Sequence, residues 1–115
     1  MKFAILVVSA ALMAGCAAPS NSARLGGPQK TLASQKTSAE VAQCIQVSWQ
    51  DTKLFGDTAD VFLDRLDDGG FTVFTTQSRY FADVLRQGGG SEVRFYAPDG
   101  GDQVRLRSAS VATCL

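Results

Sequence analysis

The 115-residue sequence has no histidine, and it has only three cysteines and a single tryptophan. The absence of histidine excludes Ser-His and Cys-His catalytic sites, zinc sites with imidazole ligands and a histidine pH switch. A net charge is also lacking, because 11 Lys and Arg residues balance 11 Asp and Glu residues. Proteins that bind nucleic acid generally carry an excess of basic residues, so no nucleic-acid partner is expected. The chain is long enough for one domain at most.

The apolar run at the N-terminus is too short to be a membrane-spanning helix. Met1-Lys2-Phe3 is a short basic start, and residues 4–13 form the apolar run. Crossing the hydrocarbon core takes about 20 apolar residues, whereas a basic start, a short apolar run and small residues are typical of a secretory signal. The segment Leu12-Met13-Ala14-Gly15-Cys16 resembles the lipobox of bacterial lipoprotein precursors, in which leucine is usual at the position of Met13.

This resemblance implies that residues 1–15 are a signal peptide and that Cys16 becomes an N-terminus acylated with palmitate-type chains. Several acyl chains hold a protein nearly permanently on a membrane. The residue after the cysteine is Ala17 rather than aspartate, which by similarity with enteric lipoproteins implies an outer-membrane location. Such a protein could lie on either the periplasmic side or the surface side of the outer membrane. The alternative is ordinary signal cleavage close to Cys16, which would leave a soluble protein.

The segment that follows, residues 16–37, is predicted to be an acylated cysteine with a flexible tether. Residues 17–37 contain no aromatic residue and only two large aliphatic ones, Leu25 and Leu32. Such a composition cannot bury enough apolar surface to offset the entropy lost on ordering. The tether is basic, with a charge of +3, whereas residues 38–115 have seven basic and 11 acidic residues and so a charge of −4. The basic tether suits anionic lipid headgroups, and ordinary solubilising charge is the alternative explanation. The three basic residues of the predicted tether are Arg24, Lys30 and Lys36.

Two cysteines remain in the predicted domain, residues 38–115. A domain of this size has a small core, and secreted domains of similar size are often stabilised by disulfides. In an oxidising compartment Cys44 and Cys114 have one possible pairing within the chain. The sequence therefore predicts a Cys44–Cys114 disulfide. Two buried thiols or a bridge between chains are the alternatives.

The clearest predicted element is a helix from Ser38 to Gln50. Thr37 and Glu40 have the spacing of a capping box at its start. One helical face then carries Val41, Cys44, Ile45, Ser48 and Trp49. Further along the chain the period changes to two, with strands expected at 60–66, 71–77, 80–87 and 92–97. A helical turn is the alternative at 80–87, where the glycines that follow favour a strand.

The C-terminal segment fits two interpretations. Val104-Arg105-Leu106-Arg107 alternates as a strand does, whereas Val104, Ser108, Val111 and Leu115 line one face of a helix. The expected fold is α+β: one N-terminal helix packed on a four- to five-stranded antiparallel meander, with the C-terminal segment (strand or short helix) tied to the helix by the disulfide. This order of elements, with Gly90-Ser91-Glu92-Val93-Arg94-Phe95-Tyr96 and a final Cys-Leu, resembles small cysteine-bracketed lipoproteins of Gram-negative bacteria. The resemblance transfers no active site.

No cluster of residues in the sequence predicts catalysis, a metal site or a cofactor. The glycine run within 88–91 precedes a predicted strand rather than a helix, unlike a phosphate-binding loop. The acidic residues within 57–68 and 99–102 fit turns and lack the spacing of a calcium loop. Aromatic and arginine side chains are typical of binding faces. The predicted partner-binding residues are Tyr80, Tyr96 and Arg94, with both tyrosines expected to be exposed and Phe81 and Phe95 buried.

The sequence thus favours a non-enzymatic, lipid-anchored envelope protein that binds an unknown envelope protein or serves as a structural module. An inhibitor or immunity-type lipoprotein that blocks an envelope-acting enzyme is the alternative, because a rigid, acidic, disulfide-held domain suits that role. A hydrolase of envelope glycans that uses two carboxylates is the least favoured class, since no spacing singles out a pair of acids.

Overall fold

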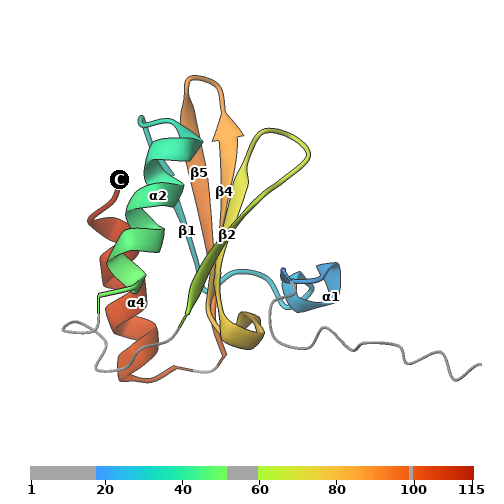
Figure 1. Ribbon diagram of the computed structural model, residues 1–115, viewed down its shortest axis with the longest axis vertical. Helices are drawn as coiled ribbons and strands as arrows, with labels where there is room; N and C mark the ends of the chain where they lie inside the picture. The colour runs from blue at the N-terminus through green and yellow to red at the C-terminus, as the bar shows by residue number, and fades with distance from the viewer. Residues whose placement is uncertain (1–17, 52–59, 99) are drawn as a thin grey trace, which may run out of the picture.

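The structure is a computed structural model that describes residues 18–51, 60–98 and 100–115. One antiparallel sheet lies between two helices on one side and an N-terminal segment on the other (Figure 1). The elements in chain order are α1 (Asn21–Arg24), β1 (Lys30–Ser34), α2 (Ser38–Trp49), β2 (Val61–Arg65), β3 (Phe71–Thr75), the short 3₁₀ helix η1 (Thr76–Ser78), β4 (Phe81–Gln87), β5 (Gly90–Tyr96) and α4 (Asp102–Ala112). This is the α+β fold that the sequence predicts.

The strands lie in the order β1-β5-β4-β3-β2. β2 pairs antiparallel with β3, β3 with β4 and β4 with β5, so these strands form the predicted meander. The turn between β2 and β3 contains Asp68, whose Oδ1 accepts a hydrogen bond from the backbone N–H of Gly70 at 3.2 Å. This local bond is typical of aspartate in turns. Alternate residues of each strand face opposite sides, and we call the side covered by α2 and α4 the inner face.

Helix α2 packs on the inner face of the sheet as the sequence predicts. Its N-cap is Thr37, whose Oγ1 accepts a hydrogen bond from the backbone N–H of Glu40 at 3.2 Å. Ile45 and Trp49 are no more than 2% exposed. The Trp49 ring meets the Phe95 ring edge to face, with centroids 6.0 Å apart. These contacts join the predicted helical face to β5, and they make the inner layer the main hydrophobic core.

The C-terminal segment is the helix α4, which decides between the two interpretations of its sequence. Asp102 lies in its first turn, where a negative charge is favoured by the helix dipole. Val111 and Cys114 are buried against α2 and the sheet. The predicted disulfide is present: Cys44 and Cys114 are bonded with an S–S distance of 2.07 Å and Cα atoms 5.6 Å apart. It ties the C-terminal segment to α2.

The prediction of a flexible tether is wrong for residues 18–37. This stretch contains α1 and β1, and β1 pairs with β5 along its whole length, from Lys30 opposite Phe95 to Ser34 opposite Ser91. A strand at the edge of a sheet gains its stability from backbone hydrogen bonds, which composition alone does not reveal. The folded domain therefore begins well before residue 38.

The close approach of β1 to β5 gives a prediction about Gly90. A Cβ on Gly90 would lie 2.2 Å from the carbonyl oxygen of Ser34, a backbone atom that cannot move aside alone, whereas a Cβ on Gly89 would meet nothing within 4 Å. We expect Gly90→Ala to lower the free energy of unfolding by about 1–3 kcal/mol and Gly89→Ala to change it by at most about 0.5 kcal/mol. Chemical denaturation checks both variants, and equal stabilities would contradict the packing of β1 described here.

Candidate binding site on the outer face of the sheet

Four aromatic rings cross the outer face of the sheet, one from each strand of the meander. Phe62, Phe74, Phe81 and Tyr96 are opposite one another in the register of neighbouring strands. The rings of Phe62 and Phe74 stack with centroids 5.3 Å apart, and those of Phe81 and Tyr96 stack at 4.5 Å. Phe74, Phe81 and Tyr96 are buried although α2 and α4 lie on the other face. We call these four residues the aromatic row; its burial requires cover from another part of the chain.

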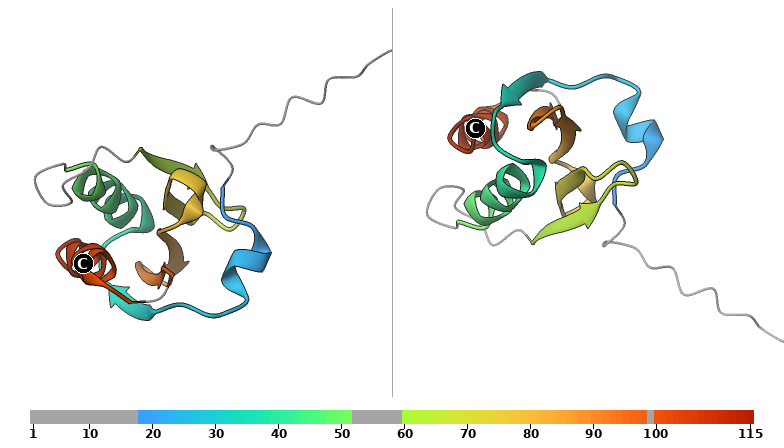
Figure 2. Two further views of the ribbon diagram at one scale, coloured as in Figure 1. Left: turned by 90° about the horizontal axis from the view of Figure 1, so that it is seen from below. Right: turned by 90° about the horizontal axis from the view of Figure 1, so that it is seen from above.

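Part of this cover is residues 18–29, which we call the strap. Figures 1 and 2 show α1 on the side of the sheet opposite α2 and α4. Nε and Nη2 of Arg24 donate to the two carboxylate oxygens of Asp83 at 2.6 and 2.8 Å. The same guanidinium lies 5.4 Å from the centre of the Phe81 ring and donates through Nη1 to the carbonyl oxygen of Pro19 at 2.9 Å. Arg24 thus clamps the strap to β4, at Asp83 and at the Phe81 ring of the aromatic row.

The charges at this clamp are matched. The hydrogen bonds to Asp83 raise the pKa of Arg24 above its ordinary value, against the opposing effect of partial burial. Burial is the main cause that raises the pKa of Tyr96, and the negative charge of Asp83 adds to it. Tyr96 therefore stays a neutral phenol to higher pH than a free tyrosine. The clamp is thus a compensated ion pair beside neutral aromatic rings, rather than an unpartnered acid or base.

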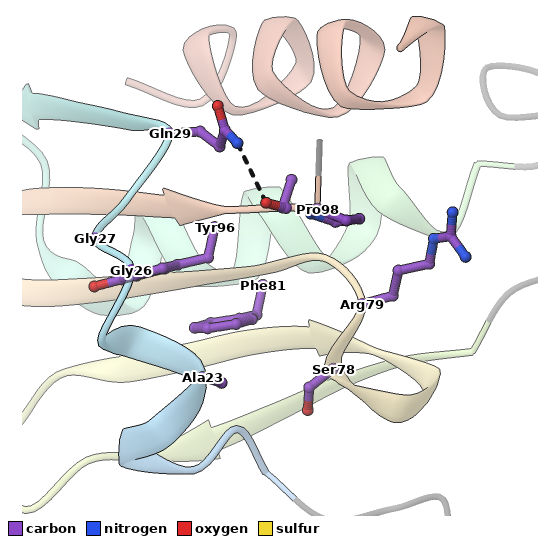
Figure 3. A pocket seen from close by; sticks show the side chains of 10 residues that line it. Ala23, Gly26, Gly27, Gln29, Ser78, Arg79, Phe81, Tyr96 and Pro98 are labelled. Atoms are coloured by element: carbon purple, nitrogen blue, oxygen red, sulfur yellow. Dashed lines mark hydrogen bonds between the residues drawn. The ribbon is translucent and has the colours of Figure 1, made fainter. Parts of the chain in front are cut away.

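A hollow of about 510 Å³ lies between the strap and the adjoining ends of β4 and β5 (Figure 3). Phe81 and Tyr96 project into it side by side, and Gln29 borders it, donating through Nε2 to the carbonyl oxygen of Ala97 at 3.3 Å (Figure 3). The volume falls in the range of pockets that receive small ligands. The described residues that line it are Ala23, Gly26, Gly27, Gln29, Ser78, Arg79, Phe81, Tyr96, Ala97 and Pro98. They include one cation and no carboxylate, so they provide a surface for binding rather than an acid–base pair.

The loop that borders the hollow has an unusual backbone. Gln77 and Ser78 have φ values of 61° and 54°, in the left-handed region that favours glycine. Such conformations cost about 1–3 kcal/mol each and are concentrated at functional sites. The loop is held in place by Tyr80, whose N–H donates to Oγ1 of Thr75 at 3.1 Å and whose carbonyl oxygen accepts from the N–H of Thr75 at 3.0 Å. The structure thus keeps Ser78 at the rim of the hollow at an energetic cost.

The three predicted partner-binding residues do not form one exposed surface. Tyr80 and Tyr96 are both buried, so the prediction that they are exposed is wrong. Tyr80 lies on the inner side, where its ring is 4.8 Å from the guanidinium carbon of the buried Arg107. Tyr96 and Arg94 share the outer face of β5, where Arg94 is exposed and forms an ion pair with Glu92 at 3.0 Å. Of the three, Tyr96 alone lines the hollow.

Sequence reasoning missed the strap and the aromatic row. One signal for them was present: β3 and β4 carry apolar residues on both faces, as at Val73 and Phe74 or at Phe81 and Ala82. A sheet with two apolar faces needs a layer on each side. The predicted elements supplied only one layer, so a cover for the second face had to come from the segment assigned to the tether.

Cys16, the signal peptide 1–15 and Asp57 lie outside the described residues. Within 18–51, 60–98 and 100–115, no helix is long and apolar enough to cross a membrane. No group of three or more cysteine or acidic side chains gathers as metal ligands in the same part of the chain.

Comparison with known proteins gives no relative. No family model, no curated protein and no solved structure matches the chain.

Proposed function

We propose that the protein is a lipid-anchored, non-enzymatic component of the bacterial envelope that binds a partner protein through the hollow beside the strap. The lipobox-like segment ending at Cys16 supports the anchor and the outer-membrane location. The observation on which the binding role rests is the pair of stacked rings, Phe81 and Tyr96, in a hollow bordered by Arg79. Tyrosine and arginine are enriched among the residues that contribute most to protein–protein affinity, and such residues lie in pockets that exclude water.

A binding role fits this lining better than catalysis does. Hydrolysis by acid–base chemistry needs two carboxylates placed about a substrate, and the described lining residues include none. Asp83, a buried acid on β4, accepts two hydrogen bonds from Arg24. Inhibition of an envelope-acting enzyme remains the second form of the same binding role, in which a loop of that enzyme would occupy the hollow.

Photocrosslinking in intact cells tests the proposal. A benzophenone amino acid in place of Gln29, at the rim of the hollow, is expected to give a discrete covalent adduct with one envelope protein. The matched control carries the same amino acid in place of Val47, which is 68% exposed on α2 at the opposite side of the molecule. An adduct from position 29 that is absent from position 47 supports the proposal.

The identity of the crosslinked protein separates the two forms of the binding role. A structural or transport protein of the envelope supports the leading form, and a single lytic enzyme supports the inhibitor. The same adducts from both positions, or none from position 29, would count against a specific site in the hollow.

A further inference from the structure

The strap brings the folded domain close to the expected lipid. Pro19 is already buried, and its carbonyl oxygen accepts a hydrogen bond from Arg24. Cys16 lies two residues before Ala18, where the described chain begins. Consecutive Cα atoms are 3.8 Å apart, so the Cα of Cys16 lies within about 7 Å of the Cα of Ala18. A flexible tether of the predicted length would have had a reach of roughly 25 Å. Because residues 18–29 are instead held on the domain, almost none of that reach remains between Cys16 and the folded part.

The place where the chain leaves the domain is fixed on one face. The bidentate pair between Arg24 and Asp83 holds the strap to β4, and β1 continues from it into the sheet. Helices α2 and α4 lie on the opposite side (Figures 1 and 2). A protein held by a lipid at Cys16 therefore has its outer face nearest to the bilayer and its two long helices farthest from it.

Two properties of the strap fit a bilayer surface. Leu25 is 85% exposed, more than any other large apolar side chain in the described chain, and it adjoins the clamp residue Arg24. The strap holds no acidic residue, and its one basic residue, Arg24, is paired with Asp83. The exposed Lys30 follows the strap directly, whereas residues 38–115 carry a charge of −4. Basic segments next to a membrane are attracted to anionic headgroups. The part of the chain that the lipid brings to the membrane is thus free of acidic side chains and is followed by the basic Lys30.

We propose that the domain docks directly on the anionic phospholipid surface of the membrane that holds its lipid, with the strap against the headgroups and Leu25 in the interfacial region. The inference rests on the acylation of Cys16 in the proposed function. It also places the hollow at the level of the headgroups, because strap residues form one of its walls. A partner that enters the hollow would then be a protein embedded in the membrane or lying on it.

The test uses the mature protein purified from membranes and placed in vesicles of phosphatidylethanolamine and phosphatidylglycerol. A fluorescent thiol label is attached at Leu25→Cys or, as the matched control, at Val47→Cys. Both positions are exposed and carry large apolar residues, so neither label disturbs the core. Lipids that carry a nitroxide near the glycerol backbone are expected to quench the label at position 25 several-fold more strongly than the label at position 47. Mass analysis of the N-terminal peptide is done on the same samples.

The two readouts distinguish the failure of each proposal. An acylated peptide with strong quenching at position 25 alone supports the docking. An acylated peptide with equal quenching at both positions overturns the docking and leaves the anchor intact. A peptide without acyl chains overturns the anchor and, with it, the docking that depends on the anchor.

Discussion

Replacing Cys44 and Cys114 together by serine is expected to lower the free energy of unfolding by about 2–5 kcal/mol. The bridge joins residues 70 positions apart, and closing a loop of that length in the unfolded chain contributes about 4 kcal/mol in the chain-entropy model. Cys114 is 1% exposed within the main core, so serine there also buries a hydroxyl group among apolar side chains. Because a domain of this kind has a total stability of about 5–15 kcal/mol, the double variant should melt at a much lower temperature.

The matched control for this prediction is Cys16→Ser, which removes the cysteine that is not in the bridge. Thermal unfolding of a chain carrying Cys16→Ser alone should match that of the same chain with Cys16, whereas adding the two other substitutions should lower the melting temperature. Thiol titration of the denatured, unreduced Cys16→Ser chain should find no thiol. Two thiols per chain, or a double variant as stable as its parent, would show that the bridge does not stabilise the domain in solution.

The inner half of the fold could be predicted because its signals are local. Helix α2 has an N-cap at Thr37 and an apolar face with helical spacing, and both are visible within a dozen residues. The hairpins follow from alternating residues and glycine-containing turns. The Cys44–Cys114 pairing needed only the count of cysteines left for the domain. Each of these inferences depends on residues near one another in the chain or on simple arithmetic.

The outer half could not be predicted, because its contacts join distant segments. β1 has a single buried-side leucine, Leu32, and its pairing with β5 depends on backbone groups that every sequence carries. The pair Arg24–Asp83 spans 59 positions, and nothing in either local sequence marks the partner. Tyr80 directly precedes Phe81, and the register of β4 and β5 places Phe81 opposite Tyr96, so the two tyrosines lie on opposite faces of the sheet. Tyr80 is therefore buried in the inner core beside Arg107, and Tyr96 is buried in the outer cluster next to the strap.

Removing residues 18–35 is expected to lower the free energy of unfolding by about 3–5 kcal/mol. The truncated chain loses the five residue pairs between β1 and β5, and each backbone hydrogen bond contributes about 0.5–1.5 kcal/mol. It also uncovers Phe81 and Tyr96, whose full exposure would cost about 1.5–3 kcal/mol for each side chain. The entropy regained by the freed segment offsets part of this loss. A chain that begins at Ala18 is the control, since it keeps the strap and β1 without any residue before them.

Arg24→Ala in the chain that begins at Ala18 isolates the clamp from the strand. We expect a smaller loss than for the truncation, about 1–3 kcal/mol, because Asp83 loses both of its charged hydrogen bonds while β1 stays paired. Chemical denaturation of the three chains should therefore rank them in the order control, Arg24→Ala, truncated chain. If all three unfold at the same denaturant concentration, residues 18–35 are a tether after all. The anchor at Cys16 would then hold the domain through a long flexible tether, and no face of the sheet would be fixed against the membrane.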